Sequence, residues 1–265
     1  VDMIHNTRDA HFGGNLPAPT VKGLGELRNR VTTGGYELGI AFDGDGDRLG
    51  IIDRTGRYLS ANEILVMLYW YLHEKKGWRG PVVRNLATTH MLDVMAASFG
   101  EVCYEVPVGF KYISSKIDEV DAVLGGESSG GLTVRGHIHG KDSVYAASLF
   151  VEMISVVEKS PSEIMDALTA AYGTFRMVED NITFTPEQKS YVDRVIFVER
   201  RLPDFGKPVS RVSYEDGCKV YFADNSFVIC RFSGTEPLLR IFAEASDEAA
   251  ARGFVTAFRE LLALE

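Results

Sequence analysis

Cysteine is scarce in this sequence, with three residues in 265. Cys103, Cys218 and Cys230 lie far apart and are odd in number, which argues against a disulfide framework and for a reducing compartment, the cytoplasm. Long apolar runs are missing as well. The longest, Ile64–Leu72, has nine residues, about half of the ~20 that a membrane-spanning helix needs. The sequence therefore predicts a cytoplasmic protein that does not cross a membrane.

Basic residues are outnumbered by acidic ones. The chain has 28 Lys and Arg against 37 Asp and Glu, a formal net charge of −9. Nucleic-acid binding draws on basic surface, so we expect no nucleic-acid partner. Low-complexity segments and fixed-period repeats are also absent. The hydrophobic share of 45 % is typical of a globular protein, and the length suits one large or two medium domains.

Short apolar runs alternate with helical patterns over the first part of the chain. The strand-like runs are 38–42, 49–52, 81–85, 102–105 and 122–124. The clearest helical patterns are 61–75 and 142–158. This alternation predicts an α/β fold with a mixed or mostly parallel sheet flanked by helices. Beyond Tyr172 strand-like segments dominate, which predicts a second, smaller α+β domain.

The segment Asp43-Gly44-Asp45-Gly46-Asp47-Arg48 follows the first apolar run. Three carboxylates at alternate positions repel one another unless a cation lies among them, and oxygen ligands favour Mg²⁺. An EF-hand fails because Arg48 and Arg54 stand where that loop needs Gly and Glu. A solvated acidic turn is the alternative. We assign Asp43, Asp45 and Asp47 to Mg²⁺, and expect Arg48 to face an anionic substrate in the same cleft.

A glycine-rich segment, 125–131, follows another strand-like run. Glu127 can accept hydrogen bonds from sugar hydroxyls, and Ser129 can donate or accept them. His137, His139 and Lys141 follow closely and add cationic or acid–base capacity. We assign His137 and Lys141 to substrate binding together with Glu127 and Ser129. The alternative is a glycine-rich turn with nearby structural histidines.

The segment 231–237 reads Arg-Phe-Ser-Gly-Thr-Glu-Pro and lies between two strand-like runs. A guanidinium, two hydroxyls and a flexible run of backbone N–H groups suit a phosphate. We assign phosphate binding to Arg231, Ser233, Gly234 and Thr235, with a plain polar hairpin loop as the alternative. Earlier in the chain, Lys111 lies where a helical pattern begins and could approach a phosphate as a point charge.

Taken in this order, DGDGDR, GESSG and RFSGTEP, with VGFK at 108–111, resemble the loops of the α-D-phosphohexomutase superfamily, the phosphoglucomutase/phosphomannomutase enzymes. The resemblance implies a four-domain enzyme that transfers a phosphoryl group from an active-site phosphoserine to a hexose phosphate. A hexose 1,6-bisphosphate, here glucose 1,6-bisphosphate, is the implied intermediate and activator. Arg48 and Lys111 would be catalytic residues that stabilise charge near the reacting oxygen.

The family serine motif, T-A-S-H-N-P in form, is absent, and the chain begins Val1-Asp2-Met3. We therefore expect part of a longer protein, inactive alone, whose partners include the missing domains 1 and 2. The expected division is 1–32 for the end of domain 2 and a linker, 33–158 for domain 3, and 159–265 for a linker and domain 4.

The sequence GESSGG is closer to glucose-preferring members than to those in which this loop ends in Gly-His. It favours the interconversion of glucose 1-phosphate and glucose 6-phosphate. A phosphomannomutase or a dual phosphomannomutase/phosphoglucomutase is the first alternative. A non-catalytic module that binds sugar phosphates is an alternative of another class.

Overall fold

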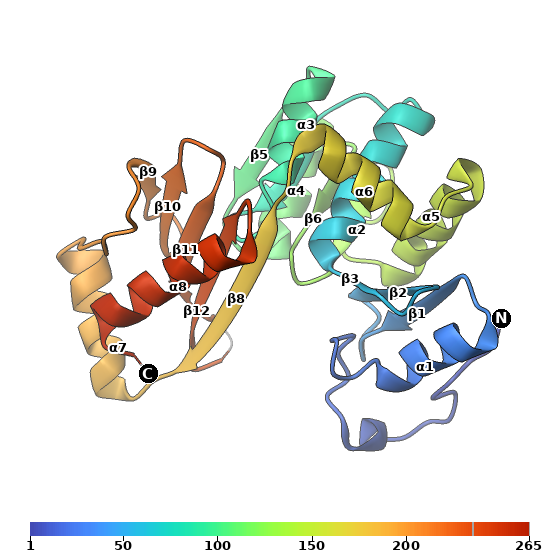
Figure 1. Ribbon diagram of the computed structural model, residues 1–265, viewed down its shortest axis with the longest axis horizontal. Coiled ribbons are helices and arrows are strands. Elements are labelled where there is room, and N and C mark those ends of the chain that lie inside the picture. The colour runs from blue at the N-terminus through green and yellow to red at the C-terminus, as the bar shows by residue number, and fades with distance from the viewer. Residues whose placement is uncertain (235, 265) are drawn as a thin grey trace.

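The computed structural model describes residues 1–234 and 236–264. The strands form three sheets, and helices pack against each of them (Figure 1). This arrangement confirms the predicted mixed α/β fold, with an α/β part followed by a smaller α+β part. Over the described residues, none of the helices combines the length and the apolar character that crossing a bilayer requires.

The first sheet is antiparallel and has the order β1-β2-β3. Its strands are β1 (Leu38–Phe42), β2 (Leu49–Asp53) and β3 (Tyr58–Leu59). A short helix η1 (Phe12–Gly14) precedes it, and α1 (Gly25–Gly34) packs on it through Leu24, Val31 and Ile52.

The sequence pattern assigned the first two of these strands to the mostly parallel sheet, and this assignment is wrong. The segment 43–48 between β1 and β2 can only turn the chain back, because a parallel crossover needs a dozen residues or more.

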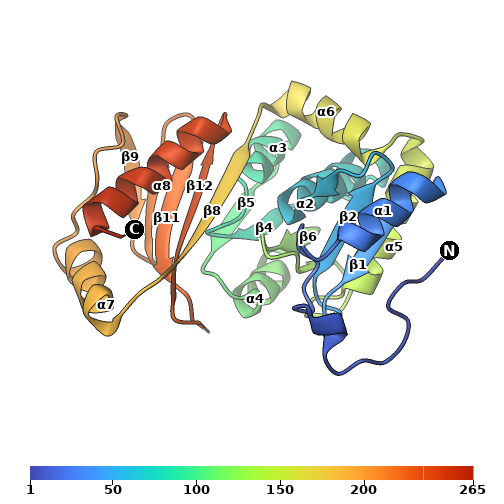
Figure 2. The same ribbon diagram turned by 60° about the horizontal axis from the view of Figure 1, so that its bottom comes forward.

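The second sheet is mixed, in the order β5-β4-β6-β7, and only β7 runs antiparallel to its neighbour. Its strands are β4 (Val82–Asn85), β5 (Cys103–Val106), β6 (Leu124–Gly126) and β7 (Leu132–Val134). Its helices are α2 (Ala61–Trp70) with its continuation η2 (Tyr71–Lys75), α3 (Met91–Phe99), α4 (Phe110–Val120), α5 (Ser143–Val157) and α6 (Pro161–Tyr172). Helix α4 forms a small core with Val83 and Val106, while the other helices share the large core (Figure 2). Because β4, β5 and β6 run parallel, their carboxyl ends lie at the same edge of the sheet, together with the loops that follow them.

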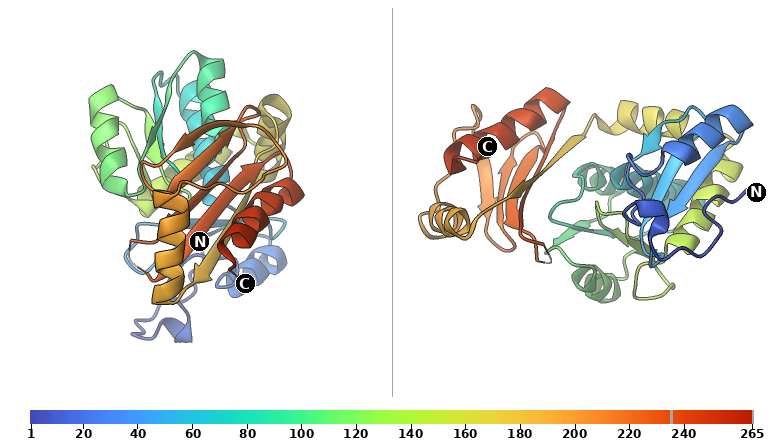
Figure 3. Two further views of the ribbon diagram at one scale, coloured as in Figure 1. Left: turned by 90° about the vertical axis from the view of Figure 1, so that its left-hand side faces the viewer. Right: turned by 90° about the horizontal axis from the view of Figure 1, so that it is seen from below.

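The third sheet is antiparallel throughout, in the order β8-β12-β11-β10-β9. Its strands are β8 (Arg176–Thr183), β9 (Val209–Ser213), β10 (Cys218–Phe222), β11 (Phe227–Phe232) and β12 (Leu238–Ala245). Its helices are α7 (Pro186–Val192), continued by η3 (Asp193–Val198), and α8 (Glu248–Leu262). One face of the sheet packs on α8, and Figure 3 shows this helix lying across the strands.

The opposite face of this third sheet packs against the second sheet. Phe227, Ile229 and Phe242 form an apolar cluster with Leu86 and Ala87, which follow β4. Because side chains alternate along a strand, β11 contributes to both faces and fixes the third sheet onto the rest of the chain.

Buried charges accompany this apolar contact. Glu105 of β5 accepts from Arg84 Nη1 and from Lys219 Nζ of β10, each at 2.6 Å. Arg84 also binds Asp93 through Nε at 2.6 Å and Nη2 at 2.9 Å. Arg84 and Lys219 are 2 % and 1 % exposed. We call Arg84, Asp93, Glu105 and Lys219 the interface cluster.

Candidate functional site

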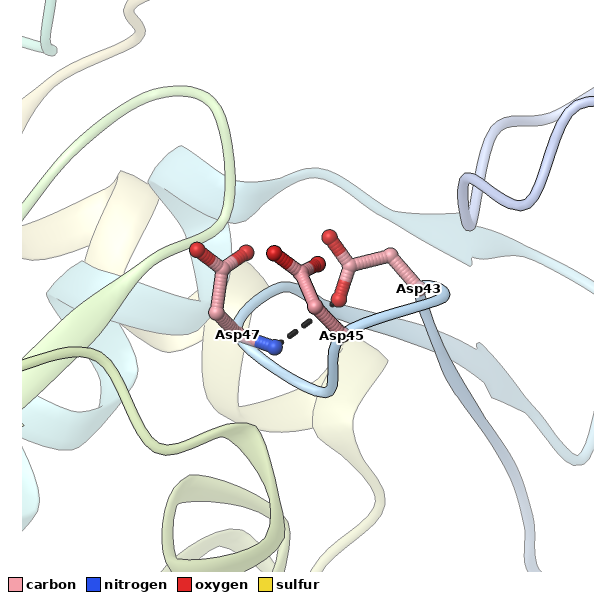
Figure 4. A group of neighbouring side chains, drawn as sticks. All are labelled: Asp43, Asp45 and Asp47. Carbon is pink, nitrogen blue, oxygen red and sulfur yellow. Dashed lines mark hydrogen bonds between the residues drawn. The ribbon is translucent and has the colours of Figure 1, made fainter.

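The loop 43–48, the metal loop, joins β1 to β2 and holds three carboxylates on one side (Figure 4). One oxygen from each of Asp43, Asp45 and Asp47 lies within 4.8 Å of the others. Asp43 shapes the loop, because its Oδ1 accepts the N–H groups of Asp47 and Arg48, both at 2.9 Å. The converging oxygens fit a hard cation such as Mg²⁺.

Cationic side chains surround these carboxylates. Arg48 Nε donates to Asp43 Oδ2 at 2.6 Å, and Lys141 pairs with Asp47. Burial alone would raise the pKa of Asp43, but the N–H and side chain of Arg48 and the N–H of Asp47 outweigh it and lower that pKa to about 2. Asp43 is therefore charged at neutral pH. Asp45 is exposed and the most accessible of the three.

The glycine-rich segment 125–131, the sugar loop, begins in β6 and carries Glu127 in a buried position. Its Oε1 accepts from Asn85 Nδ2 at 3.0 Å and from the N–H of Gly109 at 3.2 Å. Its Oε2 has Ser129 Oγ at 3.5 Å, which is a long contact. Because protein donors occupy Oε1, Oε2 is the oxygen with capacity left for a sugar hydroxyl.

Asn85 and Thr88 support this loop, and the sequence analysis missed both. Asn85 Oδ1 accepts from Thr88 Oγ1 at 2.8 Å, and Thr88 Oγ1 accepts from the N–H of Ser128 at 3.0 Å. Both residues are buried. Their position was a usable signal, because polar residues directly after a strand of a parallel sheet lie at its ligand-binding edge.

The metal and sugar loops contact each other. The N–H of Leu49, the first residue of β2 directly after the metal loop, donates to the carbonyl of Gly130 at 3.4 Å. The side chain of Lys141 packs against Gly131 of the sugar loop, and its ammonium group pairs with Asp47. A Cβ at Gly131 would lie 2.0 Å from Lys141 Cδ, so the lysine in this position requires glycine there. The metal loop, Lys141 and the sugar loop thus lie against one another.

The two histidines have partners of their own. His137 Nε2 lies 2.9 Å from Asp142 Oδ2, and its ring stacks on Tyr145 at 4.0 Å. His139 lies 2.9 Å from Asp118 and is exposed. His137 is thereby held beside the N-terminus of α5, close in sequence to Lys141. Its assignment to substrate binding stays a prediction.

The segment 231–237, the phosphate loop, connects β11 to β12. Arg231 ends in a guanidinium whose Nη2 donates to Asp216 Oδ1 at 3.3 Å. Ser233 closes the loop by donating its N–H to the carbonyl of Leu238 at 2.8 Å. Gly234 is exposed, while Thr235 lies outside the described residues.

Lys111 lies in the first turn of α4, exposed, with its Nζ 4.8 Å from the ring centre of Tyr112. Within the described parts of the chain it has no carboxylate partner, so its charge is available to an anion. Lys111 follows the Val108–Gly109 segment closely. That segment links the phosphate loop to the sugar loop, because Val108 donates its N–H to Asp216 at 2.8 Å and Gly109 donates to Glu127.

Three family models match the chain in succession. Residues 1–56 match phosphoglucomutase/phosphomannomutase, alpha/beta/alpha domain II, and residues 60–172 match domain III of the same series. Residues 178–261 match its C-terminal domain. The first two models are separated by residues 57–59, which hold β3, the last strand of the antiparallel sheet. The sequence analysis placed a boundary at residue 33.

Proteins with known names match over nearly the whole chain. A phosphoglucomutase/phosphomannomutase of Thermococcus kodakarensis is 30 % identical over 93 % of this chain and 52 % of its own length. A phosphoglucosamine mutase of Pseudomonas fluorescens is 28 % identical over 91 % of this chain and 50 % of its own length. The chain thus spans about half the length of these relatives.

A solved structure shares the fold. A phosphoglucomutase/phosphomannomutase family protein from Burkholderia thailandensis has a TM-score of 0.77 at 24 % identity, covering 96 % of this chain and 52 % of that one.

Proposed function

The chain belongs to the α-D-phosphohexomutase superfamily, the phosphoglucomutase/phosphomannomutase family, and from this premise we propose that it is the metal-, sugar- and phosphate-binding part of a phosphoglucomutase. The proposed reaction interconverts glucose 1-phosphate and glucose 6-phosphate through a phosphoserine and glucose 1,6-bisphosphate. The observation that supports it best is the contact between the metal and sugar loops, the first with three convergent carboxylates and the second with a buried Glu127.

Phosphoryl transfer depends on positioning and on neutralising negative charge. Asp43, Asp45 and Asp47 would hold Mg²⁺, which when bound supplies positive charge beside the transferring phosphoryl group. Arg48 is placed to donate to that group, and Lys111 to stabilise charge on the reacting oxygen.

The sugar and its second phosphate would be held by the other two loops. Glu127 accepts from ring hydroxyls through Oε2, and Ser129 adds a donor or acceptor. Arg231, Ser233, Gly234 and Thr235 would bind the phosphate that does not react. Hydroxyl groups on either side of the sugar resemble each other, so this grip tolerates turning the bisphosphate end for end between the two transfers.

We propose that the phosphoserine comes from the first domain of the same protein, and that this chain is inactive without domains 1 and 2. A non-catalytic sugar-phosphate module would bind the same ligands without turnover. An assay of glucose 1-phosphate conversion distinguishes the two, if it uses this chain with those domains restored. A protein that binds the sugar phosphate but does not convert it would contradict the proposal that the protein is an enzyme.

Replacing Asp45 with asparagine is expected to weaken Mg²⁺ binding about tenfold. Asparagine keeps an oxygen ligand but removes a negative charge from an exposed position, so folding is unaffected. Calorimetric titration with Mg²⁺ measures the change. Asp204→Asn, an exposed aspartate in another part of the chain, is the matched control. Equal affinities for the Asp45→Asn chain and the wild type would contradict the metal assignment.

Replacing Arg231 with alanine is expected to weaken glucose 1-phosphate binding at least tenfold, because a guanidinium–phosphate hydrogen bond is charge-assisted. Titration calorimetry with glucose, mannose and glucosamine 1-phosphates ranks the sugars at the same time. Arg252→Ala is the control, since this arginine is 65 % exposed on α8. If mannose 1-phosphate or glucosamine 1-phosphate bound more tightly than glucose 1-phosphate, that sugar phosphate would become the proposed substrate. Binding that survives in Arg231→Ala would contradict the phosphate loop's role.

A further inference from the structure

Asp216 lies in the turn between β9 and β10, just before Gly217, and its carboxylate is hydrogen-bonded on two sides. Oδ2 accepts the N–H of Val108 at 2.8 Å, across the contact between the second and third sheets. Oδ1 accepts from Arg231 Nη2 at 3.3 Å. The side chain is 25 % exposed. One carboxylate therefore joins the guanidinium of the phosphate loop to the segment before α4.

The Val108 side of this contact leads to the sugar loop. Val108 and Gly109 donate consecutive N–H groups to two carboxylates, the first to Asp216 and the second to Glu127 at 3.2 Å. Lys111 follows in the first turn of α4. A shift of this segment would therefore move the groups proposed to hold the sugar and the reacting oxygen.

The Arg231 side is tightly packed. The arginine side chain is 13 % exposed. A Cβ at Gly217 would lie 2.5 Å from Arg231 Cβ and 2.7 Å from the carbonyl of Cys230, and Gly217 has a φ of +95°. Only glycine at 217 lets the turn approach Arg231 this closely. Within the described chain, Arg231 Nε is buried and has no hydrogen-bond partner. Asp216 is thus the group that orients this guanidinium.

We propose that Asp216 is a positioning residue, one that holds Arg231 in register with the Val108–Lys111 segment so that the phosphate loop and the sugar loop bind the two ends of one hexose phosphate. This inference rests on the proposed function, because it concerns the same ligand. Asp216 does not touch the ligand. It acts through Arg231 on one side and through Val108 and Gly109 on the other.

The test compares Asp216→Ala and Asp216→Asn in the full chain with Asp180→Ala. The control removes a carboxylate of β8 that binds Arg259 of α8, at 2.5 and 3.1 Å. Amide hydrogen exchange is measured over residues 106–112, and calorimetry gives the affinities for glucose 1-phosphate and Mg²⁺. We expect Asp216→Ala to speed exchange at Val108 at least tenfold and to weaken sugar-phosphate binding about tenfold.

Asparagine retains an oxygen for Val108 but loses the charge that attracts Arg231. We therefore expect Asp216→Asn to lose about threefold in sugar-phosphate affinity while exchange at Val108 stays slow. Mg²⁺ affinity is expected to be unchanged in both variants, which shows that the chain has folded. The Asp180→Ala control should match the wild type in all three measurements.

A double variant separates positioning from a merely structural role. If Asp216 acts in part through Arg231, Asp216→Ala costs less affinity in the Arg231→Ala background than in the wild type, because the two changes share one contact. Independent, additive losses would overturn the inference, as would wild-type affinity in Asp216→Ala or unchanged exchange at Val108. Failure of the proposed function looks different. In that case the wild type binds no sugar phosphate, or Arg231→Ala binds it normally, and exchange at Val108 alone then decides whether Asp216 holds this segment.

Discussion

Replacing Glu105 with glutamine is expected to lower the free energy of unfolding by about 3–5 kcal/mol. Glutamine has nearly the same shape, so the change removes only the negative charge between two buried cations. Arg84 retains Asp93 as a partner. Among the described residues, Lys219 would keep only neutral hydrogen-bond partners, the Leu86 carbonyl at 2.7 Å and His90 Nε2 at 2.9 Å. Burial already lowers the pKa of Lys219 to about 7 with Glu105 present, so losing that carboxylate further disfavours its charged form. Although burial would raise it, these cations and hydrogen bonds lower the pKa of Glu105 below its usual range, so its charge is present at neutral pH.

Urea unfolding measures this loss, and a second substitution tests its cause. Lys219→Met in the Glu105→Gln background removes the buried amine that has lost its carboxylate partner and is expected to recover part of the stability. Glu179→Gln is the control, because its pair with Arg240 spans 3.7 Å and is 43 % exposed on the glutamate side. That control should change stability by less than about 1 kcal/mol. If Glu105→Gln also lost less than about 1 kcal/mol of stability, the interface cluster would not depend on its central negative charge.

Replacing Glu244 with glutamine is expected to make the protein lose about 2 kcal/mol of stability between pH 7 and pH 5, a range in which the wild type should change little. Two neighbouring buried groups explain the difference. Glu244 Oε1 accepts the N–H of His90 at 2.8 Å, and burial raises the pKa of Glu244 to about 7. Burial, with Arg84 and Lys219 nearby, lowers the pKa of His90 to about 4.

These two shifts act in opposite directions. Folded Glu244 takes up a proton as pH falls through 7, before unfolded glutamate does at 4.5, so it adds stability on acidification. His90 does the reverse. Its unfolded form is protonated below about 6.5 while the folded form stays neutral until about 4, so stability is lost on acidification. Removing Glu244 leaves the contribution of His90 unopposed. Lys219 adds a smaller loss in the same direction, because burial lowers its pKa to about 7.

Chemical unfolding at several pH values between 7 and 5 checks this prediction. Depressed carboxylates such as Asp43 contribute mainly below this range, because the ordinary pKa of that group is 3.8. His90→Gln in the Glu244→Gln background should remove the slope. Parallel stability profiles for wild type and Glu244→Gln would contradict the opposing roles of the two groups.

The fold was predictable where it depends on local pattern. Alternating apolar and helical segments indicated the parallel sheet with its helices and the later strand-rich part, because strands and helices carry different periods. That pattern did not show which sheet the first two strands belong to, because a short apolar segment looks the same in a parallel and in an antiparallel sheet. The length of the loop 43–48 carried the missing information, and it required an antiparallel pair.

The site was predictable where one loop supplies several groups, as with Asp43, Asp45 and Asp47. It was not predictable where a residue acts across the contact between sheets. Asp216 and Val108 are 108 positions apart, and Lys219 and Glu105 are 114 apart. A single carboxylate or lysine has no spacing signal by itself. Only the packing of the third sheet on the second gives these residues their partners.

The order of strands in the third sheet has a consequence for how the chain is made. Strand β8 ends at Thr183, but its neighbour in the sheet, β12, ends 62 residues later at Ala245. At ~5–20 residues per second, a ribosome needs roughly 3–12 s for that interval. Through that time β8 emerges without its partner, while the second sheet, complete at Val134, already has its strands. The late strand then enters between β8 and β11 and adds Phe242 to the contact that Phe227 and Ile229 of β11 make with Leu86 and Ala87, so the last strand made both completes the sheet and enlarges its contact with the rest of the chain.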